Sequence, residues 1–144
     1  MTRSKRMQPV AQVAESRQQE AARLLGERQR VLEEQLRRLD QLQEYRGEYA
    51  RKFEDGAGWT GLNVREYRFF LARLNQAIEE QALRVERIRA DLEQSRGHWA
   101  RCRVHRDAVD KAVDRLQADE RRQEDRREQA ENDELGQRPR RQVP

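Results

Sequence analysis

Three side chains that could bind a metal lie close together in the sequence, at His98, Cys102 and His105. On a helix, their spacing of four and then three residues places them on one face. Histidine pairs that bind zinc on a helix are four residues apart, whereas these two are seven apart, about two turns. Cys102 also occupies a position of the hydrophobic repeat, where a cysteine behaves as a small apolar residue. We therefore expect no metal site.

Other groupings that support catalysis are not found in the sequence. Gly56, Gly58 and Gly61 are close together, but no Lys-Ser or Lys-Thr follows them, as a phosphate-binding loop requires. The many carboxylates are typical of solvated helix surfaces, and no Ser/His/Asp grouping could be held rigidly. We therefore expect a protein that is not an enzyme and that uses no cofactor.

Charge is abundant and nearly balanced in this 144-residue chain, with 31 basic residues, 27 acidic residues and a net charge of +4. Acids and bases alternate along most of the sequence, as on a solvated helix surface. Basic residues gather at both ends of the chain, at 3–6 and 138–141. These ends are either simply solvated or available to an acidic protein surface, lipid headgroups or nucleic acid. Because no aromatic residues interleave with these arginines, we expect no nucleic acid as a partner. The alternatives to the function given below are a basic coiled coil that binds nucleic acid and a generic structural or chaperone-like hairpin.

The chain between Pro9 and Pro139 contains no proline, so helix is possible throughout except at the glycine-rich segment 55–62. The second helix has a good start signal, because Asn63 can cap it and Glu66 stands three residues later, as in a capping box.

The second helix carries the strongest pattern in the protein, an apolar stripe in strides of four and three over seven heptads. Such a 3.5-residue repeat predicts a left-handed supercoil with a partner helix. Only Gln81, Ser95 and Arg106 are plainly polar in this stripe. Its positions are Tyr67, Leu71, Leu74, Ile78, Gln81, Val85, Ile88, Leu92, Ser95, Trp99, Cys102, Arg106, Val109, Val113 and Leu116.

The first helix has a looser stripe, in which Leu25, Leu32 and Leu39 are seven residues apart. Upstream it weakens to Val10, then Val13 or Ala14, Ala21 and Leu24. Folding the chain back at 55–62 pairs positions whose numbers sum to about 117, and the two stripes then meet. We therefore predict an intramolecular antiparallel hairpin; a continuous homodimer is the alternative, against which the three glycines argue.

If paired positions sum to about 117, residue 116 lies opposite residue 1. The charged segment after residue 116 then has no part of the first helix opposite it. We expect it to be a single helix or partly disordered. The predicted fold is all-α, a long antiparallel two-helix coiled-coil hairpin with a projecting, highly charged C-terminal helical extension. Its parts are a basic N-terminal segment (1–9), a first coiled-coil helix (10–54), a glycine-rich turn (55–62), the paired part of a second helix (63–116), an unpaired charged helical extension (117–135) and a flexible basic tail (136–144).

Aromatic residues gather on both sides of the glycine-rich segment, at Tyr45, Tyr49, Phe53, Tyr67, Phe69 and Phe70. Two interface positions per heptad cannot bury them all, and of two adjacent phenylalanines only one can point straight at the partner helix. This surface is either a locally broadened core or an exposed patch for a partner protein.

A single cysteine excludes an intramolecular disulfide, which suits a reducing compartment. The longest apolar runs are far shorter than a membrane span, and no apolar signal-peptide core follows the basic N-terminus. We expect a cytoplasmic protein without direct membrane insertion.

With this layout, three stretches of the chain resemble the flagellar FliJ family of the type III export apparatus. They are Ala21 to Glu27, Tyr45 to Tyr49, and Tyr67 to Ile78, with the glycine-rich segment between the second and third, as in that family. The sequence differs from the family pattern at Arg38, where a glutamine can occur, and at Gln81, where a histidine can occur.

The resemblance implies a non-enzymatic coiled coil that links the hexameric export ATPase (FliI) to the cytoplasmic domain of the export gate protein (FlhA) and interacts with export chaperones. It implies a place at the cytoplasmic face of the inner membrane, through these partners. The ATPase would receive the end that carries the two helix termini. Carried over residue by residue, the gate-binding surface comprises Leu42, Tyr45, Tyr49, Phe70, Leu74 and Ala77.

Overall fold

The computed structural model describes residues 1–54 and 61–137, with side chains described except at 61–63 and 137. It contains two helices, α1 (Arg3–Glu54) and α2 (Gly61–Gln137). Most of the predicted glycine-rich turn and the basic tail lie outside the described residues. Because α2 begins at Gly61, Asn63 lies inside this helix rather than at its cap.

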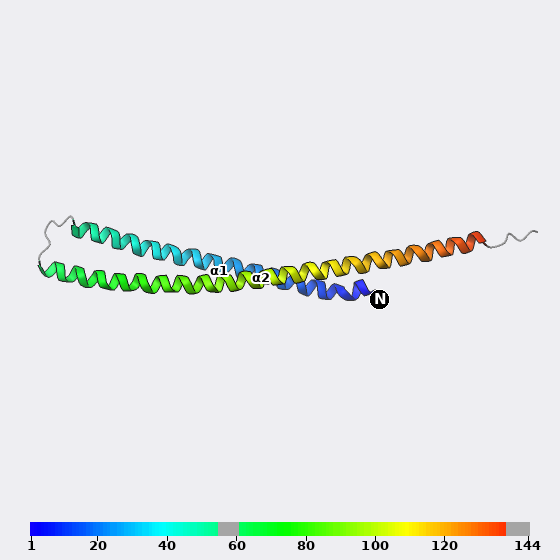
Figure 1. Ribbon diagram of the computed structural model, residues 1–144, viewed down its shortest axis with the longest axis horizontal. Helices are drawn as coiled ribbons and strands as arrows, with labels where there is room; N and C mark the ends of the chain where they lie inside the picture. Colours follow the sequence, from blue (N-terminus) through cyan, green and yellow to red (C-terminus); the bar gives the residue numbers. More distant parts are fainter. Residues whose placement is uncertain (55–60, 138–144) are drawn as a thin grey trace, which may run out of the picture. The chain divides into compact units, whose positions relative to one another are not determined.

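Each helix contributes to two compact units. The terminal unit combines Met1–Gln19 with Ala100–Pro144, and the aromatic unit is Glu20–Trp99. Within each unit the α1 and α2 segments run side by side in opposite directions (Figure 1), and hydrogen bonds such as Ser4 to Glu120 and Gln81 to Gln35 join them. The prediction of an all-α helical hairpin is confirmed.

The apolar repeat predicted on α2 is confirmed at every position. All fifteen side chains, from Tyr67 to Leu116, are buried or half-buried. The most deeply placed apolar ones include Val85 in the aromatic unit and Val109 in the terminal unit, 3% and 7% exposed. A strictly local 3.5-residue period therefore identified the face of α2 that packs on α1.

The interface of α1 is more polar than its leucine stripe suggested. The same alternating spacing of three and four residues continues along α1 from Ser4. The side chains at these positions are buried or half-buried, except for the exposed Arg46. Ala14 occupies this face, whereas Val10 and Val13 are about half exposed, so Val10 was wrongly placed at the interface. The positions are Ser4, Met7, Ala11, Ala14, Gln18, Ala21, Leu25, Arg28, Leu32, Gln35, Leu39, Leu42, Arg46, Tyr49 and Phe53.

Helix α1 begins at Arg3 instead of near residue 10, so Pro9 lies inside the helix. The early start has a physical cause in two capping contacts. Thr2 Oγ1 accepts a hydrogen bond of 3.3 Å from the Lys5 amide, the geometry of an N-cap. The Ser4 amide donates to Glu120 of α2 at 3.0 Å, and this second contact joins residues 116 positions apart in sequence.

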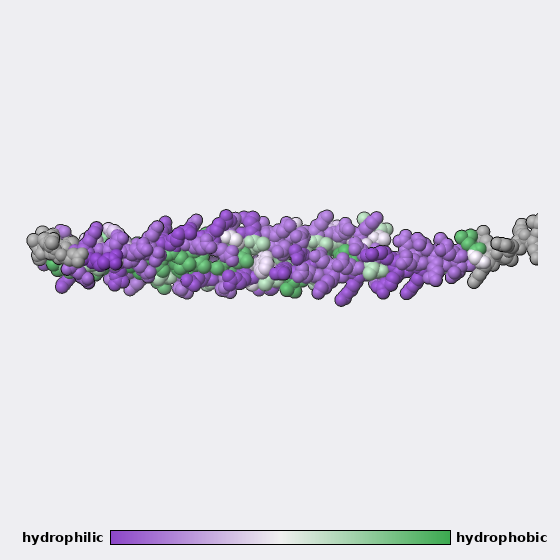
Figure 2. Space-filling view, turned by 90° about the horizontal axis from the view of Figure 1, so that it is seen from above, coloured by the Kyte–Doolittle hydropathy of each residue, from purple (hydrophilic) through white to green (hydrophobic). Residues whose placement is uncertain are grey.

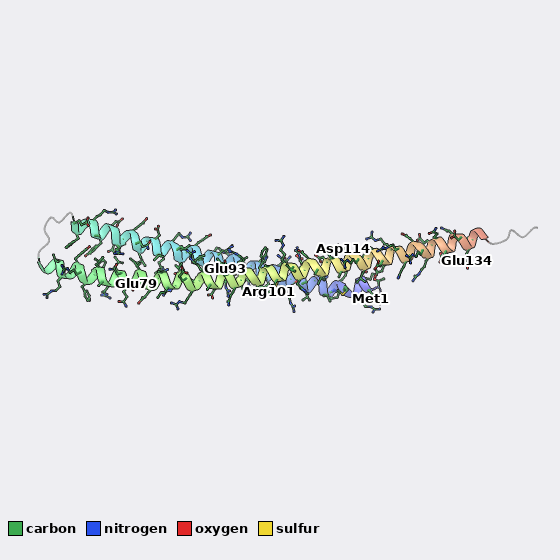
Figure 3. All side chains as sticks on the ribbon, viewed as in Figure 1. Met1, Glu79, Glu93, Arg101, Asp114 and Glu134 are labelled. Atoms are coloured by element: carbon green, nitrogen blue, oxygen red, sulfur yellow. The ribbon has the colours of Figure 1, made fainter. Side chains whose placement is uncertain are left out.

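Pairing of the two helices also extends further along α2 than expected, to Glu120 instead of ending near residue 116. Helical side chains lean toward the N-terminus of their own helix, so Glu120 reaches back to the first turn of α1. Beyond it, α2 continues as a single helix, and every residue from 121 to 136 is exposed. Figure 3 shows Glu134 on this extension, beyond Met1.

Candidate protein-binding surface

An aromatic cluster forms where the last turns of α1 pack on the first turns of α2. Tyr49 lies at the centre, with its ring centroid 4.5 Å from that of Phe70 and 5.4 Å from that of Tyr67. Phe53 stacks on Tyr67 at 3.8 Å, and Tyr45 meets Phe70 edge-on at 5.9 Å. Stacked and edge-on rings at these distances attract one another beyond their burial, so the cluster stabilises this end of the hairpin.

The cluster combines features of the two alternatives considered for the sequence. Tyr67 is buried at 8% exposure, whereas Tyr45 is 49% exposed. Tyr49, Phe53 and Phe70 are half-buried. The rings therefore broaden the local core and still present an aromatic edge to solvent.

The six residues expected to bind the export gate all lie in the aromatic unit but differ in accessibility. Leu74 is 7% exposed and belongs to the helix interface. Leu42, Tyr49, Phe70 and Ala77 are half-buried, and Tyr45 is exposed. The accessible part of this set is therefore a strip along the edge of the helix interface.

The two adjacent phenylalanines lie on different faces of α2. Phe70 joins the aromatic cluster, whereas Phe69 is 66% exposed and has the Arg73 guanidinium 5.7 Å from its ring centroid. Leu83, two heptads further along this face, is 62% exposed. Such singly exposed apolar side chains are common on protein surfaces.

Polar side chains of the two helices meet inside the aromatic unit. Gln81, 4% exposed, donates from Nε2 to the backbone oxygen of Gln35 at 3.0 Å and to its Oε1 at 2.9 Å. Arg28 donates to Ser95 Oγ and, at 3.1 Å, to the backbone oxygen of Asp91. Both buried polar positions of α2 thus find a polar partner on α1, which satisfies their hydrogen-bonding groups.

The terminal unit has its own polar layer around Arg106. One guanidinium nitrogen, Nη1, lies 3.4 Å from Gln18 Oε1 and 3.5 Å from Glu15 Oε2, and Nη2 lies 3.0 Å from Asp107 Oδ1. The third nitrogen, Nε, is buried without a hydrogen-bond partner. The sequence analysis identified Arg106 as an interface residue but missed Arg28 and Gln35. Both lie at the heptad spacing between the leucines of α1, and this spacing would have indicated them.

The potential metal ligands considered above do not form a centre. His98 and His105 are exposed and Cys102 is half-buried. In the part of the chain that the structure describes, no group of three His, Cys, Asp or Glu side chains is placed to hold a metal ion.

Hydrophilic side chains dominate the face seen in Figure 2, with a narrow hydrophobic strip along part of it. Within residues 1–54 and 61–137, neither helix contains a stretch long and apolar enough to span a membrane.

Two antiparallel helices with a heptad interface, charged outer faces and an aromatic edge define a coiled-coil protein of the all-α class. A family model described as flagellar FliJ protein matches residues 3–142, nearly the whole chain. The chain therefore belongs to the flagellar FliJ family, and it is a component of the flagellar protein export apparatus. No curated protein and no solved structure matches the chain.

Proposed function

We propose that this protein links the export ATPase ring to the export gate and assists the export of flagellar subunits, and so supports flagellum assembly and motility. The observation that carries this proposal is the family match over residues 3–142. FliI, FlhA and export chaperones are the proposed partners. The proposed place of action is the cytoplasmic face of the inner membrane.

We infer that the gate binds the aromatic unit. Tyr45, with half of its surface exposed, offers the most accessible aromatic anchor of the expected set. Aromatic side chains are enriched in interface cores, because they bury a large area with little loss of conformational freedom. Phe70 and Tyr49 support the Tyr45 ring from within the cluster at 5.9 and 6.3 Å. Leu74 contributes indirectly, by holding α2 against α1.

The terminal unit is the proposed contact for the ATPase. Its single-helix extension exposes every residue from 121 to 136, so these side chains are available to a partner along their whole length. Arg3, Lys5 and Arg6 add positive charge at the start of α1, which suits an acidic lining of a ring. No individual residue is assigned to this contact.

The gate proposal is tested by the affinity of the purified FlhA cytoplasmic domain for the variants Tyr45→Ala and Tyr45→Ala/Phe70→Ala. Loss of an aromatic anchor costs roughly 2 kcal/mol or more, so we expect at least a tenfold weaker Kd by calorimetry. Leu83→Ala is the matched control, because Leu83 is exposed on α2 of the same unit but outside the proposed surface. Unchanged affinity in a double variant that keeps its helical content and melting temperature would refute the assignment.

The ATPase proposal is tested with a chain that ends at Glu120, because this residue bonds Ser4 and must be retained. We expect weaker binding to the FliI hexamer and unchanged binding to the FlhA domain. Equal ATPase binding by the full and shortened chains would show that the extension is not the contact.

A further inference from the structure

We propose that residues 1–19, which include the start of α1, form an arm that opens from α2, and that Glu120 is the latch that holds this arm closed. The inference concerns the terminal unit alone and does not depend on the proposed partners.

The latch is a two-point contact between a carboxylate and the first turn of α1. The Ser4 amide donates to Glu120 Oε1 at 3.0 Å, and the Ser4 hydroxyl donates to Oε2 at 2.7 Å. Ser4 is only 6% exposed, so Glu120 meets a donor pair that water scarcely reaches. Both carboxylate oxygens are engaged by one residue of the other helix.

The first turn of α1 needs such a carboxylate. The first amides of a helix have no acceptor within the helix, and they form the positive end of its dipole. The first turn of α1 contains no acidic residue, so no carboxylate there offsets the positive end of the helix. Glu120 therefore serves as a capping group supplied by another helix, and Figure 3 shows the N-terminal residue Met1 beside α2.

The rest of the arm is held weakly. Its buried side chains are Ser4 and Ala14, which offer little apolar area. Pro9 lies inside the helix, where it removes one backbone hydrogen bond. The Arg106 layer adds long contacts of 3.4 and 3.5 Å to Gln18 and Glu15. Met7 and Ala11 are half-buried on the same face and add a small apolar contact with α2. The latch therefore supplies a substantial part of what closes the arm.

Opening of the arm has a structural consequence on α2. Val109, Val113 and Leu116 occupy the face of α2 that packs on α1, and Val109 is buried at 7% exposure. When the arm leaves, these side chains become an apolar strip next to the charged extension. Local opening of this kind is measured by the exchange of backbone amide hydrogens.

The test compares amide exchange, followed by mass spectrometry, in the full chain and in Glu120→Gln. Glutamine keeps the size of the side chain but replaces one acceptor oxygen with a donor. We expect exchange over residues 5–14 to be at least about fivefold faster in Glu120→Gln, with residues 25–50 unchanged. Glu128→Gln is the matched control, because it removes the same charge from an exposed site of the extension.

A second variant, Ser4→Ala, keeps the Glu120 charge and the backbone donor but lacks the hydroxyl donor. We expect an intermediate acceleration, compared with Ser16→Ala on an exposed position of the arm. The proposal is overturned if Glu120→Gln and Glu128→Gln exchange alike over residues 5–14. It is also overturned if Glu120→Gln lowers amide protection equally over residues 25–50, because the effect is then global. A lack of amide protection over residues 5–14 in the unchanged protein would overturn it as well.

Discussion

Individual polar side chains at the helix interface have specific partners. Gln81 donates a hydrogen bond to Gln35, and Ser4 donates one to Glu120. All four are polar residue types that are usually found on solvent-exposed helix faces. A buried polar group that loses its partner costs roughly 1–3 kcal/mol, so any shifted pairing of the helices is penalised. The Gln81–Gln35 contact therefore contributes to the choice of register more than to total stability.

We expect the closing of the arm to depend on pH through Glu120. Hydrogen bonds from the Ser4 hydroxyl and amide lower the pKa of Glu120 below its ordinary value of 4.5. A carboxyl whose folded-state pKa is lowered stabilises the folded state above its ordinary pKa, and this contribution is lost as pH falls through the lowered value. We expect the protection of residues 5–14, corrected for intrinsic exchange rates, to fall in acid below the ordinary carboxyl pKa.

Other charged groups surround this contact, so the pH effect must be isolated. Arg3 and Lys5 lie near it on α1, and Asp119, Arg121, Glu124 and Arg127 lie near it on α2. The difference between the unchanged protein and Glu120→Gln removes their shared contribution. An identical pH profile of arm protection in the two chains would contradict the prediction.

At the scale of the helix, α1 differs along its length. In the aromatic unit it packs leucines and aromatic rings against α2, whereas in the arm it offers mainly serine, alanine and glutamine. Pro9 further weakens the arm, because the proline ring clashes with the preceding turn and cannot donate to the Lys5 carbonyl.

Replacing this proline should stabilise the arm. We expect Pro9→Ala to lower the free energy of the closed arm by about 1–3 kcal/mol, because the helix regains a hydrogen bond and loses a clash. Slower amide exchange over residues 5–14 measures the effect. Gln12→Ala, a change on an exposed position nearby, is the control and should alter exchange little. Faster exchange in Pro9→Ala would show that proline is needed where it stands.

For the whole molecule, the question is what makes α1 pair with α2 of the same chain in this register. Heptad interfaces made only of leucine-like side chains can pair in several registers and oligomeric states. A buried polar residue restricts the choice of register and oligomeric state, at some cost in stability. The Gln35–Gln81 layer has this character, because it satisfies two glutamines only when both helices are in register.

The double variant Gln35→Leu/Gln81→Leu should therefore be more resistant to urea and less specific in its pairing. We expect a higher unfolding midpoint together with dimers or larger species in sedimentation velocity experiments. Gln43→Leu/Gln94→Leu adds the same leucines at exposed positions and serves as the control. A double variant that stays monomeric and gains no stability would contradict this account of the layer.

Much of the fold could be predicted from the sequence because its signals are local. The repeat from Tyr67 to Leu116 lies within one helix, and each of its positions is at the interface. The aromatic residues around the glycine-rich segment likewise predicted where rings would gather. The positions Arg28 and Gln35 were missed because polar residues weaken an apolar stripe, and their value appears only with a polar partner opposite.

The sequence by itself determined the helical class, the interface face of α2 and the family resemblance, since each follows from residues near one another in the chain. Only the tertiary structure decided that α1 begins at Arg3, that Ala14 lies at the interface while Val10 is exposed, and that Phe70 joins the cluster while Phe69 does not. These outcomes depend on the register of two helices. Ser4 and Glu120 stand 116 residues apart, and no local pattern records that one caps the other.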